Sequence, residues 1–403
     1  MGGIWIDHAT LLELPTSGDA WDRLESDARG SWGSADISNQ DNRHDVYTFA
    51  GALVAARLND DALRSKVIDA CREAMGTESG SRALAVARQL TGYVLAADLV
   101  DYYADEFVEW VRSMLTFPTT SGPKSLVASH EERPNNWGTH AGAARTAAAM
   151  YVGDTAELQR AATVFRGLLG DRTAYSGFKF GDLAWQSDPA NPVAINPLGA
   201  RIDGHDVDGA LPEELRRSGG FTWPPPKQNY CWEAMQGIVT QAWLLRRAGY
   251  ADVHQWSDEA ILRAYAWLVA VADFQATGDD AFVPYLIDAL YGFKRIDPSP
   301  AGTGKSVGYT DWTHANVDRV PGTEPPAEPA EEPPAEEPAP EEPAEEPAEE
   351  AVTIVAYYVR PGDSLYRIAQ QHGTTVTRIA TANPWLNDPN LIKAGWVLQV
   401  PIV

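Results

Sequence analysis

Two segments that lie far apart in the sequence carry side chains able to bind a carboxylate and move a proton. The first is "RPNNWGTHAGAAR", residues 133–145, in which Asn136 and His140 are four residues apart and share one face at the start of a helix. An amide donates to carboxylate oxygens, and imidazole exchanges a proton near neutral pH. The flanking Asn135 and Trp137 favour a binding site here; the alternative is a histidine that only completes a local hydrogen bond.

The second segment is "LPEELRRSGGFTWPPPKQNYCWEAMQG", residues 211–237. Arg216 and Arg217 end a short acidic helix; in a site they would grip a carboxylate, and the alternative is that they only offset the helix dipole. Tyr230, which opens the next helix, can exchange a proton with a substrate oxygen. Further side chains expected to contact a substrate, with core packing as the alternative for the two tryptophans, are Trp223, Lys227 and Trp232.

Paired helices before residue 320 would have to bring these two segments together. Small and apolar residues recur at spacings of three and four, which is the pattern of amphipathic helices. Three helix pairs are expected, with joints at Asn59–Asp60, Gly153–Asp154 and Gly249–Tyr250, so that successive joints lie 94 and 96 residues apart. Repeated hairpins of this kind bury their faces against one another. We therefore expect a mainly α fold, an (α/α) toroid over residues 1–320, with an irregular helical bundle as the alternative.

Charge and composition limit the possible partners. The formal net charge is −24, and half of it comes from the 12 glutamates of residues 321–350. An acidic chain lacks the basic surface that general nucleic-acid binding requires. In residues 321–352, proline removes backbone donors and the glutamates repel one another. We expect this run to be a flexible, disordered linker between two modules.

Several common signals are missing from the sequence. No metal-ligand spacing or cofactor motif occurs, so no cofactor is expected. The N-terminus does not have the pattern of a signal peptide, and no apolar run is long enough to span a membrane. We expect a monomer that is extracellular or associated with a cell wall, with a phage origin as an alternative. The two cysteines, Cys71 and Cys231, are expected either as one disulfide or as two buried thiols.

Residues 353–403 are expected to fold as a separate βααβ unit. The stretch "YYVRPGDSLYRIAQQHGTTVTRIATANPWLNDPNLIKAGWVLQVP" starts extended, continues through two helices and ends in "VLQVP", which returns to pair with "YYV". This pattern resembles a LysM domain, and the resemblance implies binding of N-acetylglucosamine polymers such as peptidoglycan or chitin. Leu365 is expected in its core. The residues implied for its glycan-binding groove are Gly362, Asp363, Ser364, Asn383, Pro384, Asn390 and Ile392.

The two segments described first resemble motifs of the alginate lyases of polysaccharide lyase family five. That family carries "NNH" at a helix start, then "DGxLPxExxR", then a tyrosine before an apolar helix. The counterparts here are "NNW" at 135–137, "DGALPEELRR" at 208–217 and "NY" at 229–230. The resemblance implies an (α/α) toroid and a lyase activity on an acidic polysaccharide. Trp137 replaces the family histidine, and the interval from arginine to tyrosine is longer.

The chemistry implied by this resemblance is β-elimination on a 4-O-linked uronate. Asn136 and Arg217, or Arg216, would neutralise the sugar carboxylate so that the C5 proton becomes acidic. Tyr230 would donate a proton to the leaving O4, and either Tyr230 or His140, one turn after Trp137, would remove the C5 proton. The resemblance also implies an anionic polysaccharide substrate, with Asn135, Trp137, Arg216, Trp223, Lys227 and Trp232 in contact with it.

Two other functions remain open from the sequence. The first is a cell-wall glycan hydrolase, which needs two carboxylates flanking its substrate. Glu213, Glu214 and Glu233 are available for this, although no spacing singles out a pair. The second is a non-catalytic wall-binding protein, in which Trp137 marks a degenerate lyase site.

Overall fold

The computed structural model of the chain describes residues 3–293 and 300–315 and, in the C-terminal module, residues 353–359, 365, 368–369, 372–383, 386, 392 and 396–402. Most of the described body is helical, which confirms the mainly α prediction. The predicted linker at 321–352 lies outside the described residues. The elements of the body are all helices except for one short antiparallel pair of strands, β1 (Arg201–Ile202) and β2 (His205–Asp206), among the described residues.

The three predicted helix pairs are present with their predicted joints. They are α3 (His44–Leu58) with α4 (Asp61–Ala74), α8 (Asn136–Val152) with α9 (Thr155–Leu169), and α11 (Tyr230–Arg247) with α12 (Trp256–Ala266). The first two joints use the same chemistry. A left-handed residue, Asn59 or Gly153, ends the first helix, and an aspartate then accepts the amide of the residue three positions on and so caps the second. These short polar signals explain why the joints were readable from the sequence.

The remaining elements complete the body around these pairs. The other α-helices are α1 (His8–Glu13), α2 (Asp19–Arg29), α5 (Ala83–Leu99), α6 (Asp105–Met114), α7 (Leu126–Glu132), α10 (Pro212–Leu215), α13 (Val283–Tyr291) and α14 (Thr310–Thr313). Short 3-10 turns occur at η1 (Arg216–Ser218), η2 (Val253–Gln255) and η4 (Gly278–Asp280), and α12 continues into the π-helical turn η3 (Trp267–Val271).

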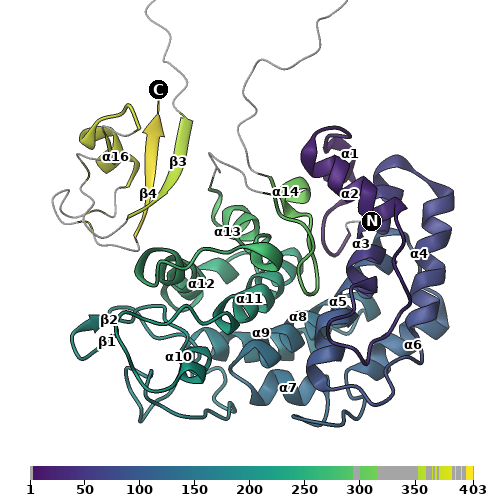
Figure 1. Cartoon of the computed structure of the whole chain (residues 1–403), viewed down its shortest axis with the longest axis horizontal. Coiled ribbons are helices and arrows are strands. Elements are labelled where there is room, and N and C mark those ends of the chain that lie inside the picture. Colours follow the sequence, from purple (N-terminus) through teal and green to yellow (C-terminus); the bar gives the residue numbers. More distant parts are fainter. Residues whose placement is uncertain are drawn as a thin grey trace, which may run out of the picture.

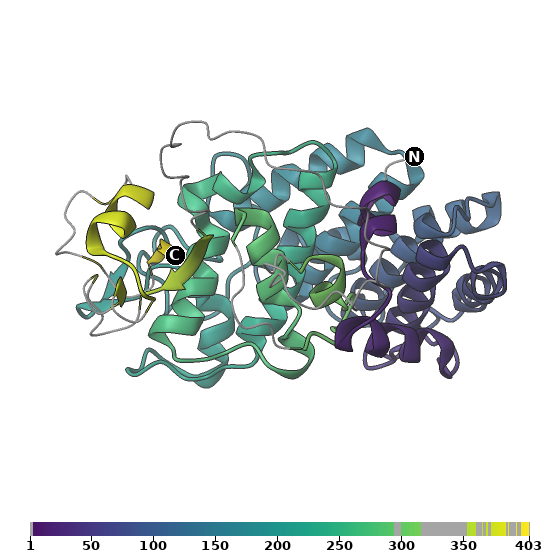
Figure 2. The same ribbon diagram turned by 90° about the horizontal axis from the view of Figure 1, so that it is seen from above.

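The body helices form an inner and an outer layer. The inner helices α3, α5 and α8 are buried on almost every side, whereas the outer helices α4 and α9 bury one face only. Inner helices pack on one another in the order α3, α5, α8, α11 and α13, and Figures 1 and 2 show this progression across the body. α14 then contacts both α13 and α2, so the series of contacts returns towards α3. This order is what a toroid requires, and the closed (α/α) toroid stays a prediction.

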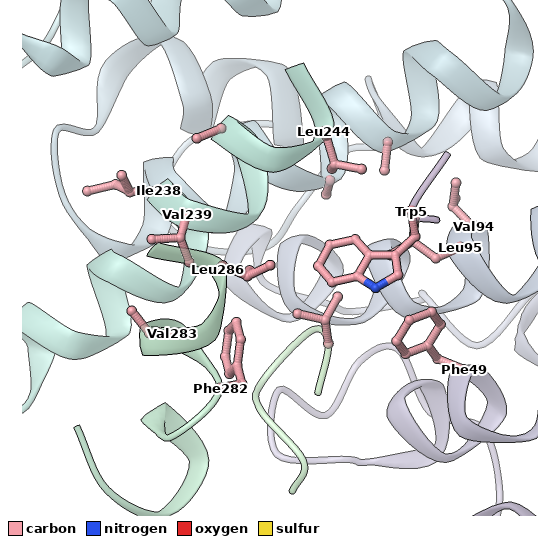
Figure 3. Packing of buried hydrophobic residues seen from close by; sticks show 14 of the residues in the cluster. Trp5, Phe49, Val94, Leu95, Ile238, Val239, Leu244, Phe282, Val283 and Leu286 are labelled. Atoms are coloured by element: carbon pink, nitrogen blue, oxygen red, sulfur yellow. The ribbon is translucent and has the colours of Figure 1, made fainter. Parts of the chain in front are cut away.

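Aromatic side chains hold the two ends of this series together. Asp311 pairs with Arg23, and Trp312 packs on Trp21 while its indole N–H donates to the carbonyl of Pro15. The segment "SVGYTDWTH", residues 306–314, therefore has a structural role where the two ends of the body meet. Nearby, Trp5 packs edge-on against Phe49 in a cluster that also draws on α5, α11 and α13 (Figure 3).

The contact between α8 and α11 is unusually close because of Gly237. A methyl group placed on Gly237 would lie 2.3 Å from the backbone carbon of Thr139 and 2.5 Å from the backbone nitrogen of His140. Only glycine therefore allows the two backbones to touch at this depth. The contact fixes the relative position of Asn136 and Tyr230, which begin these two helices.

The described part of the C-terminal module confirms the predicted strand pairing. β3 (Thr353–Tyr358) and β4 (Val397–Ile402) are antiparallel, with Thr353 opposite Ile402 and Tyr358 opposite Val397. α16 (Val376–Ala382) lies where the second helix was expected. Leu365 is buried, as predicted, and belongs to a small hydrophobic core that the module forms for itself with Val355, Val359, Ile368, Ala369, Ile379, Leu398 and Val400.

Both cysteines lie in the described part of the chain. Cys71 and Cys231 are both buried and are not joined, so the thiol alternative holds. None of the helices in the described part of the chain combines the length and apolarity needed to cross a bilayer.

Candidate functional site

The structure brings together the amide, the guanidinium and the phenol that the sequence singled out. The Nη2 of Arg217 donates to Oδ1 of Asn136 at 3.2 Å. The guanidinium carbon of Arg217 lies 4.1 Å from the centroid of the Tyr230 ring, a cation–π contact. Asn136 begins α8, Arg217 lies in η1 directly after α10, and Tyr230 begins α11 (Figure 1). Three segments distant in the sequence therefore meet at one point.

The three side chains differ in their exposure to solvent. Asn136 is buried, whereas 25% of the Arg217 side chain and 41% of Tyr230 are exposed. Nδ2 of Asn136 is buried and has no hydrogen-bond partner in the structure. An unpaired buried amide donor is costly and marks a place where a partner is expected. A carboxylate that approaches past Tyr230 would meet the guanidinium first and the amide behind it.

A buried carboxyl lies directly beneath these groups. Oε1 of Glu214 accepts the backbone N–H of Asn136 at 2.5 Å, and Oε2 lies 3.0 Å from Nε of Arg217. Burial raises the pKa of Glu214 to about 8, although the charge of Arg217 and the amide of Asn136 act in the opposite direction. Glu214 occupies the glutamate position of "DGxLPxExxR", whereas the sequence alone offers it only as a candidate hydrolase carboxylate.

A second polar cluster lies deeper, one turn further along both helices. Nδ1 of His140 is 3.1 Å from Oγ of Ser306, and its Nε2 is 3.8 Å from Glu233, which pairs with Arg88 at 2.5 Å. His140 is fully buried, and this burial lowers its pKa. Burial alone would raise the pKa of Glu233, but His140 and Arg88 bring it down to about 2. The cluster thus holds a buried imidazole beside the ion pair of Arg88 and Glu233.

The loop 300–309 brings two residues into this second cluster. Its turn is held by Arg43, whose Nη1 donates to Oγ1 of Thr303 at 2.6 Å and to the carbonyl of Gly304 at 3.1 Å. The loop places Ser306 against His140, and the Lys305 ammonium lies 2.8 Å from Asp279. Sequence reasoning missed Arg88, Lys305 and Ser306 as members of this cluster. No local motif marks them, because each meets its partners through the packing of distant elements.

Three predicted site residues have structural roles instead. Asn135 is the N-cap of α8, and its Oδ1 accepts the amide of Trp137 at 3.1 Å. Trp232 is 0% exposed and packs edge-on against Tyr265 and Phe274, so a sugar ring cannot stack on it in this structure. Trp137 is half-buried against the loop around Gly122. It points to a different face of α8 from Asn136 and His140, because successive helical residues diverge by about 100°.

The other predicted contact residues each have partners of their own. Arg216 pairs with Glu213 and packs against Gly181, which anchors the long loop before α10. Lys227 is exposed and pairs with Asp273 at 3.0 Å. Trp223 is 37% exposed and stacks on His205, with ring centroids 4.5 Å apart. Trp223 therefore keeps a surface that a sugar ring can contact.

Arg145, the last residue of the segment "RPNNWGTHAGAAR", does not lie on the surface. Arg145 is buried and is paired with Glu131 at 3.1 Å and Glu157 at 2.6 Å. It stabilises the junction of α7, α8 and α9 and cannot draw a substrate in. In the described part of the chain, Arg217 is the cation seen in contact with both Asn136 and Tyr230.

The predicted glycan-binding residues of the C-terminal module fall into two groups. Asn383 is fully buried, and its amide ties α16 to β4: Nδ2 donates to the carbonyls of Ile379 and Gln399, and Oδ1 accepts the amide of Gln399. Its hydrogen-bonding groups are therefore occupied within the domain. Ile392 packs partly buried against the module's core. The residues outside the described part of the chain are Gly362, Asp363, Ser364, Pro384 and Asn390.

Comparison with known proteins identifies the C-terminal module. Residues 357–401 match the family described as LysM domain, in agreement with the βααβ pattern and the β3–β4 pairing. The chain is also 43% identical over 44 residues to a protein named endolysin from Bacillus phage PZA. This match covers 11% of the chain and 17% of the endolysin, so it extends over a small part of either protein. A LysM domain indicates binding of peptidoglycan- or chitin-type glycan and association with a cell wall.

Proposed function

We propose that the body is a polysaccharide lyase that cleaves a uronic-acid-containing polysaccharide by β-elimination, and that the LysM domain holds it on a glycan of the cell wall. The observation that carries this proposal is the meeting of Asn136, Arg217 and Tyr230 at one place. These residues occupy the positions that the resemblance to alginate lyases of polysaccharide lyase family five implies. Their chemistry matches each requirement of the reaction.

The first requirement is to neutralise the sugar carboxylate. The C5 proton of a uronate is only weakly acidic while the neighbouring carboxylate keeps its negative charge. Arg217 supplies a partly exposed guanidinium, and Asn136 supplies a buried amide N–H that has no partner in the structure. Donors that are already in place stabilise the negative charge that develops on the carboxylate as the C5 proton leaves.

The second requirement is proton transfer at C5 and O4. Tyr230 is the exposed proton-transfer group beside Arg217, whereas His140 is fully buried and faces Ser306 and Glu233. We therefore assign both transfers to Tyr230. Its phenolate oxygen removes the C5 proton, the C4–O4 bond breaks as the C4–C5 double bond forms, and the phenol returns the proton to O4. His140 then supports the site from behind.

The carboxylates considered for a glycan hydrolase are less well suited to that reaction. A hydrolase needs one carboxylic acid and one carboxylate that reach the substrate from two sides. Glu213, Glu214 and Glu233 are all buried, and each is paired with an arginine. This arrangement favours elimination over hydrolysis as the chemistry of the body.

Incubation of the purified chain with a panel of acidic polysaccharides and with peptidoglycan tests the proposal. The panel consists of alginate, other polyuronates and purified peptidoglycan, and absorbance near 235 nm is followed. Elimination forms a conjugated double bond that absorbs there, so we expect a rise with at least one polyuronate. New reducing ends without absorbance would indicate a hydrolase. Sedimentation with peptidoglycan but no product from any substrate would indicate a binding protein with a degenerate site.

A further inference from the structure

Glu214 contacts both residues whose side chains would bind the substrate carboxylate. One of its oxygens accepts the backbone N–H of Asn136 at 2.5 Å, and the other lies 3.0 Å from Nε of Arg217. Asn136 belongs to α8 and Arg217 to η1, so a single carboxyl connects two elements that are far apart in the sequence. Glu214 itself is buried and does not reach the surface where Tyr230 is exposed.

We propose that Glu214 is a positioning residue that fixes Asn136 and Arg217 relative to each other, and that its proton governs how tightly this pair binds a substrate carboxylate. The inference rests on the proposed lyase function and adds a regulation to the same site. Glu214 has no contact with the reacting atoms in this scheme. It acts through the two residues that do contact the substrate.

The reason is a competition for one positive charge. Ionised Glu214 neutralises Arg217, so an incoming carboxylate would have to share the guanidinium with a second anion that is buried close to it. Like charges that share a cation disfavour each other. When Glu214 holds its proton, the charge of Arg217 is free for the substrate. Protonation of Glu214 therefore raises the affinity for the anionic sugar. By linkage, binding of the sugar raises the pKa of Glu214.

The titratable groups on α11 near Glu214 do not obscure its own loss of a proton between pH 7 and 9. On its own helix, Glu213 is paired with Arg216. On α11, burial raises the pKa of the Cys231 thiol well above its usual range, and the pKa of Glu233 lies at about 2, so neither changes charge in this interval. Glu214, with a pKa of about 8, loses its proton there.

The chain offers a matched control in the neighbouring pair. Glu213 and Arg216 have the same three-residue spacing as Glu214 and Arg217, and Glu213 is equally buried. Glu213 instead accepts the amide of Gly181 at 3.1 Å and so supports the loop before α10. Replacing Glu213 by glutamine therefore perturbs a buried ion pair beside the site without changing the group that faces Asn136.

The test measures KM and kcat at 235 nm from pH 6.5 to 9.5 on the polyuronate that the wild-type chain cleaves. We expect KM of the wild-type chain to rise at least fivefold between pH 7 and pH 9. Glu214→Gln, which cannot ionise, is expected to lose this rise, whereas Glu213→Gln keeps it. Glu214→Ala, which removes both contacts, is expected to raise KM at least tenfold at pH 7 with a smaller effect on kcat.

The possible failures are distinct. No product from any polyuronate would overturn the lyase function itself. An active wild-type chain whose KM is constant from pH 7 to 9, or a Glu214→Gln variant that keeps the wild-type rise, would overturn the role of Glu214 and leave the lyase intact. The wild-type profile needs no variant, so the test does not depend on whether each variant folds.

Discussion

The guanidinium of Arg217 lies over the ring of Tyr230, with its central carbon 4.1 Å from the ring centroid. The loop between them contains glycines, three consecutive prolines and an exposed tryptophan. It reverses the chain, so that α10 and α11 contact each other. The same guanidinium reaches Asn136. Arg217 is therefore the residue through which all three segments of the site are connected.

Replacement of Tyr230 by phenylalanine tests the proton-transfer assignment. We expect Tyr230→Phe to lower kcat by about 100- to 10,000-fold, the range that a general acid or base contributes. The melting temperature should change little, because Tyr230 is 41% exposed. Tyr103→Phe is a matched control, since Tyr103 is 43% exposed and donates its hydroxyl to Asp98, away from the site. Unchanged turnover in Tyr230→Phe would exclude the phenol as acid and base.

The two adjacent asparagines should separate catalysis from stability. Asn136→Ala removes the unpaired amide and should lower kcat/KM at least 30-fold. Asn135→Ala removes the cap of α8 and should reduce the free energy of unfolding by about 1 kcal/mol with near-normal turnover. Kinetics at 235 nm and urea unfolding of both variants check this. Equal losses of turnover in the two variants would contradict the division of roles.

The tryptophans Trp223 and Trp232 should respond to substitution in opposite ways. Trp223→Ala removes an exposed ring that can stack on a sugar, so we expect a higher KM and an unchanged melting temperature. Trp232→Ala leaves a cavity in the core, and the free energy of unfolding should fall by about 3–5 kcal/mol. Kinetics and thermal melting of the two variants measure these effects. A Trp223 variant with wild-type KM would remove that ring from the substrate site.

Removal of the LysM domain should separate wall binding from turnover. The body and the LysM domain each bury a hydrophobic core of their own. We expect residues 1–320 to cleave a soluble polyuronate within about twofold of the full chain and to stay in the supernatant when mixed with purified peptidoglycan. The full chain should sediment with the peptidoglycan. Sedimentation of the shortened chain to the same extent would place the wall-binding surface in the body.

Buried histidines should make the protein sensitive to acid. Burial lowers the pKa of His44 to about 4 and that of His314 to about 3, against about 6.5 in the unfolded chain. Below pH 6.5 these histidines bind protons in the unfolded state but stay neutral in the folded state until the pH approaches their lowered pKa values. The free energy of unfolding therefore falls as the pH falls from 6.5 towards 4. Between pH 7 and pH 4.5 the free energy of unfolding of the wild-type chain should fall. In His44→Gln we expect this fall to be smaller by roughly 2–3 kcal/mol. Urea unfolding at both pH values measures this difference, and equal losses would contradict it.

Local signals allowed much of the fold to be predicted. The joints at Asn59–Asp60 and Gly153–Asp154 were readable because capping depends on residues only a few positions apart. Asn136, Arg217 and Tyr230, which the structure places together, stand out in the sequence because each belongs to a short motif. The pairing of β3 with β4 followed in the same way from the extended ends of the LysM pattern.

The rest of the site could not be read from the sequence, because it depends on how distant elements pack. Arg88 meets Glu233 across 145 residues, and Ser306 meets His140 across 166. The structural roles of Trp232 and Asn135 could not be read from the sequence for a related reason. The residue type indicates only that a tryptophan can stack on a sugar or that an asparagine can bind one. Whether the side chain faces solvent depends on the packing around it.

The missing side chain of Gly237 has a consequence for any effort to alter this protein. α8 and α11 touch at that glycine, whereas Tyr230 lies seven residues away, about two helical turns or roughly 10 Å along the axis. A methyl group at Gly237 would push the two helices apart and tilt them relative to each other. The resulting displacement would be larger at Tyr230 than at the contact itself. Substitutions meant to change which sugar is accepted should therefore target exposed side chains such as Trp223 and leave Gly237 unchanged.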